Sequence, residues 1–531
     1  MGADMLSVAE IVAADFIALP TIIAAHAARR GAAIALVDER RQASWAELGA
    51  ISERIAAALQ AAGVSPCEPV ALAATNSVEA ALAFLGILRA GAAAALLTSS
   101  ASGETVLAML IDSTARVLLL DTAMADAIAH LPFPAGVMRI AIDDSHAGLP
   151  MSQWLPPIGT RAAPVTIAPA DPFNIIYSSG TTGVPKGIVQ SHKMRHEYAR
   201  RTLASGYDDG TAVLCSTPLY SNTTLVSFFP ALAGGGKVVL MAKFDAQRFL
   251  ALSQAERVTH AMLVPVQYRR IMEQVNFGSY DLSSYTLKSA TSAPFPAWLK
   301  ADVLARWPGG LLEAYGMTEG GASTLLLAHE FPDKLHTVGR VAPGHVMKII
   351  DEDGHELPPG AVGEIVGHSP TMMTGYHGKD DKTREAEWYD TDGRRFIRHG
   401  DVGRFDEDGF LILMDRSKDL IISGGFNVFP TDLEAVLARN AAVREAAVIG
   451  IPSDRWGETP FAVIVLADQS ADPQAILTQA NADLGKTQRI SGIAVIGELP
   501  RSAIGKVLKR ELRDKFGGNP ITQAFSPEKS L

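Results

Sequence analysis

Short apolar runs alternate with longer amphipathic stretches along the first part of the chain. Runs such as Pro69–Ala73 and Val117–Asp121 are continuous and short, which is typical of strands buried on both faces. Trp45–Ala62 and Val78–Ala90 repeat apolar residues at helical spacing, and Ser44 followed by Glu47 indicates a helix start. Strands and helices in this alternation predict a layered α/β body with parallel sheet.

The alternation continues beyond the middle of the sequence. The tripeptide Gly234–Gly236 breaks the chain just before one apolar run. We expect strands at Val213–Cys215, Lys237–Leu240 and Ala261–Val264, and helices at Asp245–Glu256 and Pro296–Arg306.

From about Gly339 the pattern changes to short strands separated by turns rich in aspartate and glycine. The turns are Asp351–Gly354 and Asp406–Gly409, which favour hairpins. The strands are expected at Met347–Ile350, Gly363–Gly367, Phe396–Arg398 and Phe410–Met414. This pattern predicts a β-rich subdomain at about residues 339–415.

The last hundred or so residues follow a charged stretch at Asp415–Asp419 and read as a small α+β unit. Thr431 and Glu434 are interpreted as a capping box, with strands at Val448–Ile451 and Ala462–Leu466 and a helix at Asp472–Leu484. The fold expected is therefore α/β, with layered α/β subdomains and the β-rich subdomain in an N-terminal domain of residues 1–415. A hinge at 416–419 and a small, mobile α+β domain at 420–531 complete it.

Composition narrows the class of protein. A net charge of −10 makes broad nucleic-acid binding a poor expectation. The only cysteines, Cys67 and Cys215, argue against a disulfide framework or a structural zinc site, and they suit a cytoplasmic protein. The apolar stretch Ala80–Leu97 contains Arg89 and two glycines, so it is interpreted as a buried helix running into a strand. Peripheral membrane contact and a homodimer stay open.

The segment Tyr177–Gly187 carries the clearest chemistry. Its sequence, Tyr-Ser-Ser-Gly-Thr-Thr-Gly-Val-Pro-Lys-Gly, combines hydroxyls, glycines and one lysine. Glycines let the backbone approach a ligand, successive N–H groups can form an anion-binding nest, and Lys186 adds a positive charge. The spacing differs from a Walker A loop. The segment predicts a polyphosphate loop between two strands, and the alternative is a flexible surface loop.

Further motifs lie along the chain in a fixed order. Tyr315–Glu319 reads Tyr-Gly-Met-Thr-Glu, Asp401 follows His399 and Gly400, and Pro500–Lys506 stands near the end. Together with the polyphosphate loop and Asp415-Arg416, this set resembles the adenylate-forming superfamily of acyl-CoA synthetases, peptide-synthetase adenylation domains and beetle luciferases. The resemblance runs from about Leu19 to Arg513.

The resemblance implies a nucleotide site. Tyr315 would stack on adenine, Thr318 would contact the α-phosphate, and Glu319 would bind Mg²⁺, which prefers few carboxylates beside phosphate oxygens. Asp401 and Arg416 would bind the ribose, although His399 stands where most relatives have threonine. The remaining ATP-binding residues expected are Ser178, Ser179, Gly180, Thr181, Thr182, Gly183 and Lys186 near the phosphates, Ser292, Ala293 and Pro294 on the wall opposite Tyr315, and also Gly316 and Met317.

The resemblance also assigns a catalytic lysine, a hinge and the residues that would line the paths of the two other substrates. Lys506 would be the adenylation lysine, bridging the substrate carboxylate and the α-phosphate, and Lys418 would lie in the hinge. Coenzyme A would approach past Gly424, Gly425 and Trp456. The acyl pocket would be lined by Tyr220, Ser221, Asn222 and Thr223, with Ser221 where many relatives have histidine or another ring.

These expectations describe an ATP-dependent carboxylic acid–CoA ligase that uses Mg²⁺, ATP and coenzyme A. Three alternatives stay open: an enzyme that loads a carrier protein, a non-catalytic nucleotide-binding relative, and a luciferase-like oxygenase. His192 and His196 have the spacing of a metal pair, but no third ligand pattern accompanies them. The acid itself, whether aliphatic, aromatic or bulkier, does not follow from the sequence, because the shape of the pocket decides it.

Overall fold

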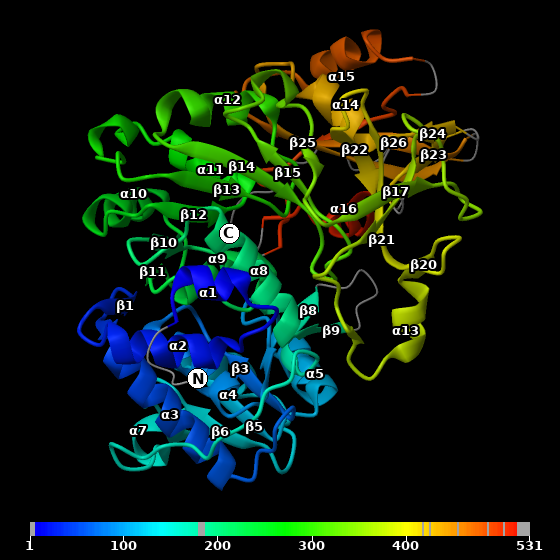
Figure 1. The fold of residues 1–531 in the computed structure, drawn as a ribbon. Helices are drawn as coiled ribbons and strands as arrows, with labels where there is room; N and C mark the ends of the chain where they lie inside the picture. The colour runs from blue at the N-terminus through cyan, green and yellow to red at the C-terminus, as the bar shows by residue number, and fades with distance from the viewer. Residues whose placement is uncertain are drawn as a thin grey trace. The chain divides into compact units, whose positions relative to one another are not determined.

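The computed structural model describes residues 6–178, 186–416, 419–423, 426–453, 456–485, 488–502 and 505–517. The chain forms two compact units (Figure 1). Unit 1 comprises residues 1–347 and 367–397, and unit 2 comprises residues 348–366 and 398–531.

The first sheet of unit 1 is mainly parallel. Its order is β16-β15-β14-β13-β12-β10-β11-β1-β2, and all neighbours from β14 to β1 pair in parallel. The strand β10 lies between β11 and β12, so β11 is added on one side of β10 and the strands that follow are added on the other. The strands are β1 (Ile34–Val37), β2 (Gln42–Ser44), β10 (Ala212–Cys215), β11 (Lys237–Leu240), β12 (His260–Leu263), β13 (Leu287–Ala290), β14 (Gly310–Tyr315), β15 (Thr324–Leu327) and β16 (Arg340–Val341).

The second sheet of unit 1 contains the strands on both sides of the predicted phosphate loop. Its order is β19-β9-β8-β4-β3-β5-β6-β7, and β8 pairs antiparallel with β9. The predicted placement of the loop between two strands is therefore confirmed. The strands are β3 (Pro69–Ala73), β4 (Ala93–Leu96), β5 (Val117–Leu120), β6 (Met138–Ala141), β7 (Leu149–Pro150), β8 (Pro172–Ser178), β9 (Lys186–Ser191) and β19 (Gly375–Tyr376).

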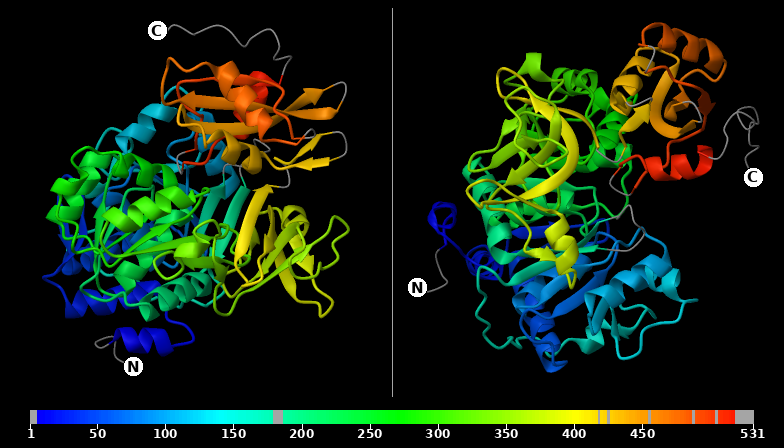
Figure 2. Two further views of the ribbon diagram at one scale, coloured as in Figure 1. Left: turned by 90° about the horizontal axis from the view of Figure 1, so that it is seen from above. Right: turned by 90° about the vertical axis from the view of Figure 1, so that its right-hand side faces the viewer.

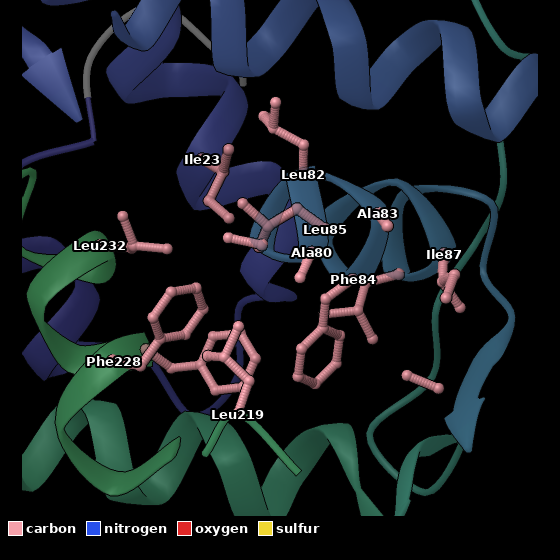
Figure 3. Packing of buried hydrophobic residues seen from close by; sticks show 14 of the residues in the cluster. Ile23, Ala80, Leu82, Ala83, Phe84, Leu85, Ile87, Leu219, Phe228 and Leu232 are labelled. Atoms are coloured by element: carbon pink, nitrogen blue, oxygen red, sulfur yellow. The ribbon is translucent and has the colours of Figure 1, made fainter. Parts of the chain in front are cut away.

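Helices cover these two sheets and supply much of the core. In one buried cluster, Phe84 of α4 packs edge-on against Phe229 of α9 with ring centroids 5.2 Å apart. Figure 3 shows this cluster, in which α2, α4 and α9 meet Leu219. The helices are α1 (Val8–Ala13), α2 (Leu19–Arg29), α3 (Trp45–Ala61), α4 (Val78–Arg89), α5 (Gly103–Ser113), α6 (Thr122–Ile128), α7 (Met151–Trp154), α8 (His192–Ala204), α9 (Asn222–Ala233), α10 (Ala246–Ala255), α11 (Pro265–Met272), α12 (Ala297–Arg306) and α13 (Asp380–Glu385), with short 3₁₀ helices at Phe277–Ser279 and Pro332–Lys334.

The third sheet is the predicted β-rich region. Its strands are ordered β17-β18-β21-β20, and β22 also pairs with β21. The sequence predicted only a three-residue strand at Phe396–Arg398, which is too short, because β21 continues through Asp401 and pairs with β22 there. The strands are β17 (Val346–Ile350), β18 (Gly363–His368), β20 (Glu387–Tyr389), β21 (Arg395–Phe405) and β22 (Leu411–Arg416).

The fourth sheet, in unit 2, has the order β24-β23-β26-β25, with β27 paired to β26. Leu512 of α16 is buried in a cluster with residues of β25 and β26, and Figure 2 shows α16 in red beside this sheet. The elements are β23 (Ile421–Ser423), β24 (Phe426–Val428), α14 (Pro430–Leu437), β25 (Val443–Ser453), β26 (Gly457–Leu466), α15 (Pro473–Ala482), β27 (Ile493–Val495) and α16 (Lys509–Phe516).

The predicted capping box at Thr431 and Glu434 is wrong. A box with Thr431 as N-cap would start the helix at Asp432, but α14 begins two residues earlier, at Pro430, and its N-cap residue is Phe429. The Thr431 hydroxyl donates to the carbonyl of Met414 instead. Glu434 accepts a hydrogen bond of 2.9 Å from the Val448 amide and pairs with Lys509 at 2.8 Å, so its partners are distant in sequence.

The predicted fold class is confirmed: the chain is mixed α/β, with a large N-terminal region of layered sheets and helices and a smaller C-terminal region. The limits 1–415, 416–419 and 420–531 stay a prediction. Among the described residues, every helix is too short or too polar to cross a membrane.

Candidate functional site

Tyr376 joins two of the predicted site residues in unit 1. Its hydroxyl donates a hydrogen bond of 2.9 Å to Oε1 of Glu319. The Nζ atom of Lys186, at the start of β9, lies 5.5 Å from the centre of the same ring, a cation–π distance. Burial, followed by the nearby Glu319 carboxylate, raises the pKa of Tyr376, so its hydroxyl stays protonated and remains a donor. One tyrosine thus lies between the cation of the phosphate loop and the predicted magnesium ligand.

The backbone around Glu319 is held from both sides. The Met373 amide donates to the carbonyl of Glu319 at 2.8 Å, and the Gln190 side chain donates to the carbonyl of Thr318 at 2.8 Å. Gly320 follows with a φ of +80°, and a Cβ there would lie 1.8 Å from the Thr371 carbonyl oxygen. Only glycine fits this close approach. Thr318 and Glu319 therefore sit on a fixed loop after β14, together with Gly316 and Met317.

Ser292 connects the predicted adenine wall to the predicted acyl pocket. Its hydroxyl and that of Thr223 share a hydrogen bond of 2.7 Å. Ser292 also has a φ of +80°, which is rare for a residue with a side chain and stores strain. Ala293 is partly buried and Pro294 is exposed beyond it. The structure brings these two predicted groups of residues into contact.

The other predicted pocket residues lie at the start of α9. The Ser221 hydroxyl caps the helix by accepting from the Thr223 amide at 3.3 Å, which explains a serine at this position locally. Tyr220 is buried, and its hydroxyl shares a hydrogen bond of 2.8 Å with Ser100. Asn222 is partly buried and accepts a hydrogen bond of 2.9 Å from Arg195.

The contacts of Tyr376, Gln190, Asn174 and Arg195 did not emerge from the sequence. Asn174 and Gln190 are fully buried on β8 and β9, and Arg195 is buried on α8. A signal was present, because asparagine and glutamine within apolar strand runs are unusual for buried positions. Their partners, however, lie on other elements, so the contacts depend on how β8, β9 and α8 pack together.

In unit 2, Asp401 and Arg416 are directly opposite each other in the register of β21 and β22. The neighbouring His399 is buried, and this burial lowers its pKa to about 4. The ring is therefore neutral at pH 7. This explains how histidine can replace the expected threonine without adding a charge next to Asp401.

Lys506 stands at the end of a tight turn in unit 2. Arg501 and Val507 form an antiparallel bridge, the Ser502 amide donates to the Lys506 carbonyl at 2.8 Å, and Gly505 has a φ of +76°. Arg501 also pairs with Glu445 at 2.9 Å, which fixes the turn to β25. Trp456 lies in the turn between β25 and β26 and is 42% exposed.

Several predicted site residues lie outside the described residues. They are Ser179, Gly180, Thr181, Thr182, Gly183, Lys418, Gly424 and Gly425. Ser178 is the last residue of β8, and Arg416 is the last residue of β22.

A cavity of about 290 Å³ lies elsewhere in unit 1, at the carboxyl ends of β3, β5 and β6. The residues lining it include none of those expected in the nucleotide site. The four carboxylates that line it already serve the fold. Asp38 accepts from the amides of Arg40 and Val78, and Glu39 pairs with Arg248 at 2.7 Å. Asp121 accepts from the amide and hydroxyl of Thr75, and Asp143 accepts from the amide and hydroxyl of Thr122. These bonds account for the carboxylates without a ligand.

Comparison with known proteins decides the family. A family model described as AMP-binding enzyme matches residues 23–377, and one described as AMP-binding enzyme C-terminal domain matches residues 432–506. The chain belongs to the AMP-binding enzyme family. The predicted resemblance to adenylate-forming enzymes is confirmed.

Two curated relatives of this AMP-binding enzyme span almost its whole length. A fatty acid–[acyl-carrier-protein] ligase from Streptomyces coeruleorubidus is 31% identical, covering 93% of this chain and 95% of the relative. A feruloyl-CoA synthase from Amycolatopsis sp. is 32% identical, covering 89% and 94%. These relatives are named as ligases or synthetases, which agrees with the prediction that this chain is an acid–thiol ligase.

A solved structure shares the fold. The o-succinylbenzoate CoA synthetase from Bacillus subtilis, in complex with its acyl-adenylate intermediate, has a TM-score of 0.81 at 27% identity, covering 93% of this chain and 98% of that one. The AMP-binding enzyme described here is therefore similar to enzymes that act through an acyl-adenylate.

The described residues fit magnesium at Glu319. Its Oε1 is held by Tyr376, which leaves Oε2 for a cation beside the phosphates, and one carboxylate suffices for Mg²⁺ in such a setting. His192 and His196 lie buried on α8 and form no metal cluster with a third ligand among the described residues. Among the described residues, the group of side chains close enough together to hold a metal ion is Asp351, Asp353 and His355, of which Asp353 and His355 are exposed.

Proposed function

We propose that this enzyme is an ATP-dependent carboxylic acid–thiol ligase that works in two steps. A carboxylate oxygen of the acid attacks the α-phosphorus of ATP, the bond to the β-phosphate breaks, and pyrophosphate leaves. The thiol of coenzyme A then attacks the carbonyl carbon of the acyl-AMP, loses its proton and releases AMP. The two steps give acyl-CoA, AMP and pyrophosphate.

The contact of Tyr376 with both Glu319 and Lys186 supports this proposal most strongly. The lysine begins the strand after the hydroxyl-rich loop, and the carboxylate follows Thr318, an arrangement that supports binding of a polyphosphate and its cation. Bound magnesium would offset charge on the phosphates. The chain's own residues would position the nucleotide: Tyr315 against adenine, Thr318 at the α-phosphate, and Asp401 and Arg416 at the ribose.

Lys506 is proposed to neutralise the charge that builds up between the attacking carboxylate and the α-phosphate. Its fixed turn and the glycine before it support a role in which the lysine is presented at a defined position. Gly424, Gly425 and Trp456 are proposed to line the approach of the thiol, and Lys418 is proposed as the hinge.

A carrier protein is the second candidate acceptor, because the acyl-carrier-protein ligase relative is 31% identical over nearly the whole chain. Purified enzyme, ATP, Mg²⁺ and a panel of aliphatic, aromatic and dicarboxylic acids should give acid-dependent pyrophosphate exchange. Thioester formed with free coenzyme A supports a CoA ligase, whereas thioester formed only on a holo carrier protein supports the alternative. Absence of acid-dependent exchange with every acid would contradict both.

A further inference from the structure

A buried arginine without a carboxylate partner contacts Asn222, one of the residues of the proposed acyl pocket. Arg195 on α8 is only 3% exposed. Its three hydrogen bonds go to neutral side-chain amides: Nε donates to Asn174 at 3.0 Å, one terminal nitrogen donates to Asn222 at 2.9 Å, and the other donates to Gln190. No carboxylate among the described residues forms an ion pair with it. Such a charge is costly to bury, so its arrangement calls for an explanation.

The guanidinium determines how all three amides are oriented. Because arginine is only a donor, each amide must turn its oxygen toward Arg195 and its NH₂ group away. The Asn174 NH₂ donates to Gln190 at 3.1 Å, and the Gln190 NH₂ donates to the Thr318 carbonyl at 2.8 Å. Two of the three outward donors therefore serve the protein, and one of them fixes the loop that carries Glu319.

The third outward donor is different. Within the described part of the chain, the NH₂ group of Asn222 has no hydrogen-bond acceptor, and the side chain is only partly buried. Asn222 begins α9, and the next residue, Thr223, contacts Ser292 of the proposed adenine wall. The donor therefore lies next to residues of the proposed acyl pocket, and the hydrogen bond from the buried guanidinium fixes its orientation and polarises the amide.

We propose that Asn222, oriented by Arg195, donates a hydrogen bond to an oxygen on the acyl chain of the substrate. This inference rests on the proposed function and narrows it: the preferred acids carry a carbonyl, hydroxyl, ether or second carboxylate oxygen besides the reacting carboxylate. An acid without such an oxygen leaves the donor unpaired in a partly desolvated site, which disfavours it. Asn222 acts in specificity, and Arg195 is a positioning residue.

The test compares matched acids with and without the oxygen. The pairs are 4-oxopentanoate with pentanoate, 3-hydroxyoctanoate with octanoate, and 4-methoxycinnamate with cinnamate, with kcat/KM measured by thioester formation. We expect the wild type to prefer the oxygenated member of at least one pair. Asn222→Leu should abolish that preference by lowering kcat/KM about 3- to 10-fold for the oxygenated acid alone, as expected for loss of a hydrogen bond between neutral groups.

Asn222→Asp is a second variant, which separates loss of the donor from misfolding of Asn222→Leu. Its carboxylate keeps the size of the side chain, pairs with Arg195 and removes the donor, so the same loss of preference is expected in a folded protein. Asn276→Leu, an identical change at an exposed position, should leave the preference unaltered.

Two results overturn the inference: a wild type without preference in any pair, or a preference that survives both substitutions at Asn222. In either case thioester still forms, so the ligase assignment stands. Loss of acid-dependent pyrophosphate exchange with every acid would instead refute the proposed function.

Discussion

At the residue scale, Tyr376 shows how an aromatic side chain can serve two charged groups. Its hydroxyl is directed at Glu319, and its ring face lies near the Lys186 ammonium. The hydroxyl removes rotational freedom from the carboxylate, much as outer-shell partners orient metal ligands. From the sequence alone, Glu319 and Lys186 could be singled out, but the tyrosine between them could not, because the pairing of β19 with β9 brings it there.

Tyr376→Phe tests this orientation. The substitution keeps the ring and removes the hydrogen bond to Glu319, so we expect pyrophosphate exchange to fall about 10-fold and the requirement for Mg²⁺ to rise. Tyr389→Phe is a matched control, because the exposed Tyr389 hydroxyl also donates to a glutamate, Glu387, at 3.0 Å. Equal pyrophosphate-exchange rates in the two variants would show that the Tyr376 hydroxyl has no role in the reaction.

At the element scale, local pattern located most strands and helices, since β3 and the start of α4 coincide with the predicted ranges. Prediction failed where the contacts of a residue are made with other elements of the fold. Glu434 reads as a capping residue locally, yet it binds the Val448 amide and Lys509. The buried amides around Arg195 depend in the same way on how β8, β9, α8 and α9 come together.

A buried ion pair between α12 and β14 gives a test of packing. Lys300 and Glu313 are paired and almost fully buried, and Lys300 also donates to the Leu335 carbonyl at 2.7 Å. Burial raises the pKa of Glu313 to about 7, which shows the cost of its charge. Lys300→Met should lower the free energy of unfolding by about 3–5 kcal/mol, because the carboxylate loses its partner.

The control is Lys382→Met, which breaks the exposed pair of Lys382 and Glu385 on α13. Here we expect a change below about 1 kcal/mol. Chemical denaturation of both variants measures the difference. Similar destabilisation in the two would show that the buried pair does not stabilise the packing of α12 on β14.

At the scale of the whole molecule, stability should depend on pH through buried histidines. Burial lowers the pKa of His192, His260, His345 and His399 to about 4, below the value of 6.5 expected in the unfolded chain. Below pH 6.5 the unfolded state therefore binds protons that the native state does not. Each histidine costs about 1 kcal/mol of stability per pH unit from 6.5 toward 4.

Glu313 acts in the opposite direction over the same range, because its raised pKa lets the native state hold an extra proton. Four histidines outweigh one glutamate, so we expect the unfolding temperature to fall steadily from pH 6.5 to pH 5. Calorimetry of the full-length protein measures this, and His260→Gln should flatten the slope. A constant or rising unfolding temperature in this window would contradict the assignment.

We propose that Lys506 serves adenylation alone, so its substitution should separate the two half-reactions of the enzyme. We expect Lys506→Ala to abolish formation of acyl-adenylate, measured as acid-dependent pyrophosphate exchange, while thioester still forms from supplied acyl-adenylate and coenzyme A. Lys515→Ala, at an exposed position of α16, is the matched control and should retain both. If Lys506→Ala keeps wild-type pyrophosphate exchange, Lys506 is not the adenylation lysine.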